Sequence, residues 1–115
     1  MAIQQWSDEI TVAELADDPQ FTEDVSALME SLEGSPRDVV LNFSAVGFIN
    51  SSNIALLLRL RKQVTSVKRR LILCGINTHV WSVLQVTGLD KILEFTNDIA
   101  TALATVQLTG KPKDK

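Results

Sequence analysis

The sequence predicts an α/β domain: a mostly parallel central sheet of four to five strands, opened by an N-terminal hairpin and packed by about four helices. Short apolar runs of strand length alternate with longer segments whose apolar residues recur at helical spacing. Polar turns and breaks that contain Gly or Pro separate these segments. Strands that alternate with helices imply right-handed crossovers, which build a parallel sheet covered by helices.

The chain is expected to begin with a hairpin of two short strands, at residues 3–6 and 9–15, around the tight turn Ser7-Asp8. One face of the second strand should pack on the core. The residues expected on this inner face are Ile10, Val12 and Leu15.

Asp17-Asp18 comes next and precedes Pro19, which breaks the strand. This acidic pair has no evident partners, so it is interpreted as a solvated strand end. A helix is expected from Thr22 to the break at residues 34–36, because acids follow Thr22 in the first turn. Its apolar residues at helical spacing are Val25, Leu28, Met29 and Leu32.

Residues 38–43 predict a strand with a continuously apolar centre, which is typical of a strand covered on both faces. Residues 44–49 form a connection, and Asn50 or Ser51 caps a helix that runs to about Ser66. The residues expected to face inward from this helix are Ile54, Leu57, Leu58, Leu60 and Val64.

The remaining elements complete the order β-β-α-β-α-β-α-β-α. They are a buried strand at 69–75, a short helix that Asn77-Thr78 begins and that runs to Val86, a strand at 92–95 and a helix at 98–108. We expect residues 1–108 to form one domain and residues 109–115 to form a flexible polar tail.

The composition is that of an ordinary globular protein, with 45% hydrophobic and 22% charged residues. No stretch approaches the ~18 consecutive apolar residues of a membrane span. The first residues lack the basic and apolar regions of a secretory signal, and the single cysteine cannot form an internal disulfide. We therefore expect a cytoplasmic protein with no membrane partner.

Charge is unevenly distributed along the chain. The first 36 residues carry nine acids and no Lys or Arg, whereas the remainder carries all eleven basic residues. Six basic residues fall within 59–70 without an acid: Arg59, Arg61, Lys62, Lys68, Arg69 and Arg70. Such a run could meet phosphates, but no aromatic residues interleave with it. It is interpreted as a solvated helix face and loop, and direct nucleic-acid binding is not expected.

Few residues could support catalysis. His79 is the only histidine, and zinc sites gather three or four ligands. Cys74 lies in an apolar strand, where a thiol behaves as a small hydrophobe. No Gly-rich phosphate-binding loop is present. Trp81 is interpreted as partly buried, with a contact to a partner as the alternative. The sequence therefore predicts no enzyme, no metal and no cofactor.

The segment Asn50-Ser51-Ser52-Asn53 places two hydroxyls at the mouth of an apolar helix. Unpaired backbone N–H groups and the positive end of the helix dipole suit a capping side chain and also a phosphate. Nothing nearby would deprotonate either serine, so a self-contained nucleophile is not favoured. A serine modified by another protein needs no base of its own, so a switch is the preferred interpretation.

Residues 48–54, 71–74 and 87–95 together resemble the STAS domain of bacterial anti-sigma-factor antagonists. In that family an apolar strand leads to a motif Asp-Ser-Ser/Thr-Gly-Leu, which opens a helix. A second apolar strand, a short helix and a Gly-Leu … Ile … Phe segment follow. The resemblance implies a STAS-like fold.

The resemblance also implies a function. In the family, the serine after the Asp is phosphorylated by a partner that is both a serine kinase and an anti-sigma factor. The unphosphorylated antagonist binds this partner and frees the sigma factor. Ser51 is then the phosphoacceptor, Ser52 is the less favoured neighbouring hydroxyl, and the partner-binding residues are Asn50, Ser51, Ser52 and Asn53.

Two positions depart from the family motif: Asn50 replaces Asp, and Asn53 replaces Gly. Asn53 is expected to add a side chain where the family leaves the backbone open to close approach. These departures leave room for a STAS-like scaffold or accessory module of a signalling complex or transport system that is not phosphorylated. A small enzyme or nucleotide-binding protein on the same fold is a third alternative.

Overall fold

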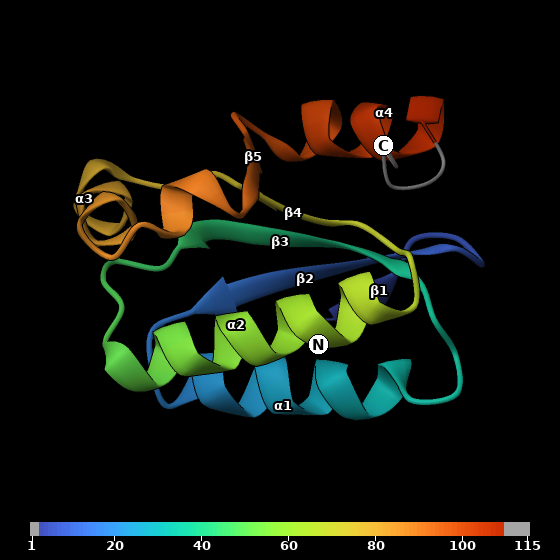
Figure 1. Ribbon diagram of the computed structural model, residues 1–115, viewed down its shortest axis with the longest axis horizontal. Helices are drawn as coiled ribbons and strands as arrows, with labels where there is room; N and C mark the ends of the chain where they lie inside the picture. Colours follow the sequence, from blue (N-terminus) through green and yellow to red (C-terminus); the bar gives the residue numbers. More distant parts are fainter. Residues whose placement is uncertain (1–2, 110–115) are drawn as a thin grey trace.

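The computed structural model describes residues 3–109, with side chains to residue 106. Five strands form one sheet in the order β1-β2-β3-β4-β5 (Figure 1). The first two strands are antiparallel, and β2 to β5 run parallel. The strands are β1 (Ile3–Gln5), β2 (Ile10–Ala16), β3 (Asp38–Ala45), β4 (Leu71–Cys74) and β5 (Glu94–Thr96). The predicted N-terminal hairpin and mostly parallel sheet are confirmed.

Helices cover both faces of this sheet (Figure 1). The helices α1 (Gln20–Leu32) and α2 (Ser51–Ser66) lie side by side on one face, and α4 (Ile99–Thr109) lies on the other. The short helix α3 (Thr78–Val86), followed by the 3₁₀ turn η1 (Leu89–Lys91), lies at the end of the sheet toward which β2 and β3 point. The predicted order of strands and helices is confirmed.

The sheet separates two apolar clusters, which explains why its central strands are apolar on both faces. The larger cluster lies against α1, α2 and α3. The smaller cluster lies under α4 and consists of Ile10, Val12, Val40, Ile72, Cys74, Ala102 and Val106. The sequence predicted that Ile10, Val12 and Leu15 lie on one inner face. This prediction is wrong, because Ile10 and Val12 belong to the smaller cluster. Alternate strand residues point to opposite faces, and Leu15 belongs to the larger cluster.

Several element boundaries differ from the expectation by one to three residues. The helix α1 begins at Gln20 instead of Thr22, β3 continues to Ala45, and β4 begins at Leu71. The last strand starts at Glu94 because η1 occupies the preceding segment. Residues 110–115 of the expected tail lie outside the described part of the chain.

Leu58 is 39% exposed, so the expectation that it faces inward is wrong. The buried stripe of α2 runs through Leu57, Leu60 and Val64. At about 100° per residue, Leu58 lies more than 90° around the helix from the centre of this stripe. No helix within residues 3–109 is long and apolar enough to span a bilayer.

Candidate switch site at the start of helix α2

The start of α2 is closed by a reciprocal pair of side-chain hydrogen bonds. Asn50 is the N-cap, as expected, and its Oδ1 accepts from the backbone N–H of Asn53 at 2.9 Å. The backbone N–H of Asn50 donates in turn to Asn53 Oδ1 at 3.1 Å. Two backbone donors at the helix mouth are thereby satisfied. The first turn of α2 is fixed in place by its own sequence.

Ser51 and Ser52 lie within this fixed turn, and both are exposed. Within the described residues no hydrogen bond involves the Oγ of either serine, so neither hydroxyl has a base beside it. The first turn of α2 contains no acid, and its remaining N–H groups and helix dipole favour a negative charge. The geometry suits a serine that an external enzyme modifies and does not suit a self-activated nucleophile.

Asn53 differs from its expected place. The sequence predicts an added side chain on the open surface, but Asn53 is only 2% exposed. Its amide Nδ2 donates to Asp18 Oδ2 at 2.9 Å, while its Oδ1 completes the cap. Both polar ends of the side chain are thus used inside the domain. Asn53 therefore supports the turn as a buried residue. Asn50, Ser51 and Ser52 are exposed at the surface.

The expectation that Asp17-Asp18 has no partners is wrong, although Asp18 is exposed as expected. Asp17 Oδ1 accepts from the backbone N–H of Gly47 at 2.8 Å, in the loop before α2. Asp18 Oδ2 also accepts from Asn50 Nδ2 at 3.3 Å. A signal was available in the sequence: β2 and β3 are neighbouring parallel strands, so the residues that follow them meet at one edge of the sheet.

The loop between β3 and α2 is held from a second side. Asn77, the N-cap of α3, accepts from the backbone N–H of Val80 at 2.8 Å and donates through Nδ2 to the carbonyl of Val46 at 3.0 Å. Phe48 stands on this loop with 55% of its surface exposed. A large apolar side chain is therefore presented on a braced loop, two residues before the N-cap.

Comparison with known proteins agrees with this architecture. The family model described as the STAS domain matches residues 4–102, which is most of the chain. The chain belongs to the STAS domain family. The sheet order, the parallel strands and the helix after β3 are therefore those of a STAS domain.

Relatives of this STAS domain include regulators of sigma factors. It is 28% identical over 86 residues to BtrV of Bordetella bronchiseptica, named as a candidate anti-sigma factor antagonist, covering 75% of this chain and 73% of BtrV. A STAS domain protein from Planctomyces limnophilus, described as an anti-sigma-factor antagonist, matches with a TM-score of 0.78 at 24% identity and covers 91% of this chain and 97% of its own.

SpoIIAA, described as an anti-sigma factor antagonist and as a Bacillus cell fate determinant, has been solved in two forms. The unphosphorylated form matches with a TM-score of 0.71 at 19% identity, covering 91% of this chain and 96% of SpoIIAA. The phosphorylated form matches with a TM-score of 0.69 at 21% identity, covering 90% of this chain and 96% of SpoIIAA. Both forms share the fold of this STAS domain.

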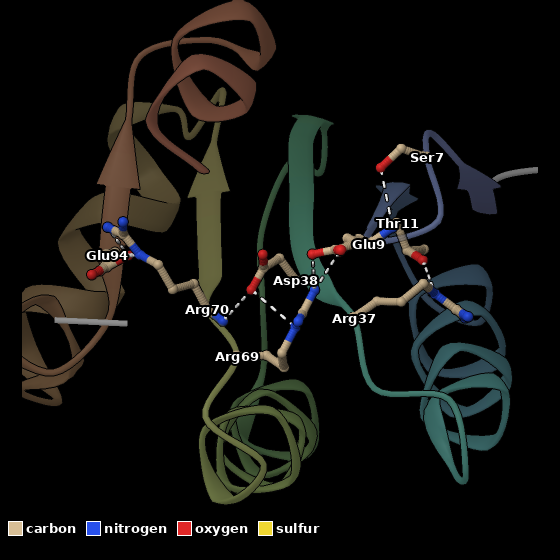
Figure 2. Close-up of polar contacts among 8 residues, drawn as sticks. All are labelled: Ser7, Glu9, Thr11, Arg37, Asp38, Arg69, Arg70 and Glu94. Atoms are coloured by element: carbon tan, nitrogen blue, oxygen red, sulfur yellow. Dashed lines mark hydrogen bonds and ion pairs between the residues drawn. The ribbon is translucent and has the colours of Figure 1, made fainter. Parts of the chain in front are cut away.

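Two arginines of the basic run at 59–70 form ion pairs within the STAS domain (Figure 2). Arg70 Nη2 pairs with Glu94 Oε1 at 2.9 Å. Arg69 Nε lies 3.4 Å from Asp38 Oδ1, and Arg69 Nη2 lies 3.4 Å from Glu9 Oε1. These two arginines link the starts of β2, β3, β4 and β5, so the view of 59–70 as wholly solvated is wrong for Arg69 and Arg70.

The thiol of Cys74, the side chain of Trp81 and the possible metal ligands do not form a site with Ser51. Cys74 is buried, and burial raises the pKa of its thiol to about 11, with Asp98 adding to the effect. Such a thiol is not a nucleophile at neutral pH. Trp81 is half-buried and packs edge-on against Phe95, with ring centroids 5.0 Å apart. Within residues 3–109 no three potential metal ligands cluster.

Proposed function

We propose that this STAS domain is an anti-sigma-factor antagonist that acts in the cytoplasm and has no enzymatic activity of its own. Its unphosphorylated form binds a cognate anti-sigma factor, which is also a serine kinase, and so releases a sigma factor. The kinase phosphorylates Ser51, and the modified form no longer binds. Asn50, Ser51 and Ser52 contact the partner, and Asn53 supports them.

One observation carries the proposal: Ser51 is an exposed hydroxyl in the first turn of α2, without a hydrogen-bonded base in the described residues. A partner enzyme can reach it, and the free N–H groups of the helix mouth can accept the product. The name of BtrV supports the antagonist role, and the two forms of SpoIIAA support a fold that tolerates phosphate.

The physical basis of the switch is a charge at a docking surface. A phosphate adds about −1.5 to −2 charge and three strong acceptors. The helix mouth stabilises this charge while it stays in water. A partner packed on the same mouth would have to remove that water without supplying a counter-charge, which costs several kcal/mol. A cost of about 2.7 kcal/mol already weakens binding a hundredfold.

Binding of three variants to the anti-sigma factor encoded in the same genome tests the proposal. Ser51→Ala should bind as wild type does but take up no phosphate, and Ser51→Asp should bind at least tenfold more weakly. Ser52→Ala, which alters the neighbouring exposed hydroxyl, should still take up one phosphate, as wild type does. Equal binding by Ser51→Ala and Ser51→Asp would contradict the switch.

The second candidate is a STAS scaffold or accessory module that is never phosphorylated. The observation that favours it is the pair Asn50 and Asn53, which uses the motif positions for an internal cap and a contact to Asp18. Intact mass measurement after incubation with the kinase and ATP decides between the two. One added phosphate that Ser51→Ala abolishes supports the antagonist, and an unchanged mass supports the scaffold.

A further inference from the structure

We propose that Asp18 is a positioning residue of the switch, which couples negative charge at Ser51 to the start of helix α1. The proposal rests on the proposed function in that it assigns the charge on Ser51 to phosphorylation. It extends the switch beyond α2: the start of α1 becomes part of the surface that differs between the two forms.

The first step is that one carboxylate serves two helices. Asp18 Oδ1 accepts from the backbone N–H of Thr22 at 3.0 Å and from Thr22 Oγ1 at 2.7 Å, in the first turn of α1. Asp18 Oδ2 accepts from Nδ2 of Asn53 at 2.9 Å and from Nδ2 of Asn50 at 3.3 Å, at the mouth of α2. No other side chain among the described residues bonds to both helix starts.

The second step is that the two helices present the same polarity to this carboxylate. Both α1 and α2 begin at the same end of the sheet and lie side by side (Figure 1). Their positive dipole ends therefore face the same region, and Asp18 is the anion placed between them. Hydrogen bonds from the side chains of Thr22 and Asn53 lower the pKa of Asp18, so it is ionised at neutral pH.

The third step is what a second anion would do here. Ser51 is adjacent in sequence to Asn50, whose side-chain amide donates to Asp18. A phosphate on Ser51 repels the Asp18 carboxylate and competes for the same amide donors and helix ends. Any weakening of the Asp18 contacts reaches Thr22 directly, because the other oxygen of the same carboxylate accepts both hydrogen bonds from Thr22.

The amide side chain of Asn50 is compatible with this arrangement. Position 50 carries an amide whose Nδ2 donates to Asp18 while its Oδ1 caps α2. An aspartate at position 50 could still cap the helix, but it would place a second carboxylate against Asp18. The amide thus leaves Asp18 as the anion at this point, and makes it sensitive to charge added at Ser51.

A double-mutant cycle on the full chain, with no kinase present, tests the coupling. The variants are Ser51→Asp and its neutral control Ser51→Asn, each made in the wild-type chain and in the Asp18→Asn background, and all are compared by their midpoints of urea unfolding. We expect Ser51→Asp to lower the midpoint relative to its neutral control Ser51→Asn when Asp18 is present. In the Asp18→Asn background the same charge should be neutral or raise the midpoint, because only the helix dipole then acts on it.

A spectroscopic readout separates coupling from general stability. The backbone amide of Thr22 donates to Asp18, so its ¹⁵N–¹H resonance should shift in Ser51→Asp relative to Ser51→Asn. The shift should vanish when Asp18 is replaced by Asn. Asp17→Asn is the matched control, since Asp17 bonds to the backbone of Gly47 and does not contact Asn50 or Asn53. It should leave the Thr22 response intact.

Additive unfolding midpoints, or an unmoved Thr22 resonance, would overturn the proposal. Equal coupling at Asp17 and Asp18 would also overturn it, because the effect would then belong to the acidic loop as a whole. These measurements need no kinase and no partner. The coupling can therefore be absent in a chain whose Ser51 is phosphorylated normally. It can also be present in a chain that no kinase modifies.

Discussion

Asp38 and Asp18 lie at opposite ends of the sheet, and their pKa values are shifted in opposite directions. Asp38 is 1% exposed, and burial raises its pKa despite the backbone N–H of Arg70 and the charge of Arg69. Asp18 is exposed, and hydrogen bonds led by the Thr22 side chain lower its pKa. Ionisation of Asp38 therefore opposes folding, and ionisation of Asp18 supports it.

These directions predict opposite pH dependences. A raised pKa in the folded state means that stability falls as the pH rises from 3.8 through that folded pKa. A lowered pKa means that stability present above 3.8 is lost as the pH falls through the folded pKa. Urea unfolding should show wild type gaining stability relative to Asp38→Asn as the pH falls from neutral toward 3.8. Below 3.8, wild type should lose stability relative to Asp18→Asn.

Curves of stability against pH that run parallel for wild type and either variant would contradict the corresponding assignment. The two variants control for each other, because each removes one carboxyl group and keeps one amide oxygen as an acceptor. A general effect of losing one negative charge would give both variants the same sign.

At the residue scale, the sequence predicted that Ser51 lies exposed at the start of α2, but it did not predict the contacts of Asp18. Ser51 could be placed because a polar turn between an apolar strand and an apolar helix defines a helix mouth locally. The bridging role of Asp18 depends on Asn50 and Asn53, more than 30 positions away. Only the pairing of β2 with β3 brings these residues together.

The start of α2 also shows how side chains fix an element. Asn50 accepts from the backbone N–H of Asn53, so its loss leaves a donor at the helix mouth without that partner. We expect Asn50→Ala to lower the free energy of unfolding by about 1 kcal/mol, the usual cost of removing an N-cap. Ser52→Ala in the same turn should change it by less than about 0.5 kcal/mol. Urea unfolding of both variants checks this, and equal values would refute the capping role.

At the scale of elements, the type of each secondary-structure element was easier to predict than the residues at which it begins and ends. Apolar runs and helical spacing identified the strands and helices in the right order. The start of α1 was missed because Pro19 was expected to break the chain, whereas it is the N-cap residue of a helix that begins at Gln20. The last strand was placed too early because Leu89–Lys91 forms a 3₁₀ turn, which has no distinct apolar spacing.

At the scale of the whole molecule, one large apolar side chain is exposed on the loop that leads into the proposed switch. Phe48 is 55% exposed on the loop that leads into α2, and Asp17 and Asn77 bind the backbone of that loop. Exposed aromatic residues on rigid supports often dominate protein interfaces. We therefore expect Phe48 to contribute to binding of the proposed partner.

Replacement of Phe48 by Ala separates binding from folding. The free energy of unfolding should change by less than about 0.5 kcal/mol, because most of the side chain is in water. Affinity for the cognate anti-sigma factor should fall about tenfold or more. Val86→Ala is the control, since Val86 is 87% exposed at the end of α3. Unchanged affinity in Phe48→Ala would remove Phe48 from the interface.

The fold was predictable from the sequence as a whole, because local signals and the right-handed crossover rule agree on one parallel sheet. The ion pairs of Arg69 and Arg70 were not, since their partners Glu9, Asp38 and Glu94 are distant in sequence. They meet only once four strand starts are aligned at one edge (Figure 2).

The central claim is that the domain accepts a negative charge at Ser51 and its partner rejects it. Both halves can be measured on one preparation of the chain phosphorylated at Ser51, by its thermal unfolding and by its affinity for the cognate anti-sigma factor. We expect the phosphorylated chain to unfold within a few degrees of the unphosphorylated chain and to bind about a hundredfold more weakly. Phosphorylated chain that binds as tightly as unphosphorylated chain, or that binds poorly because it has unfolded, would contradict it.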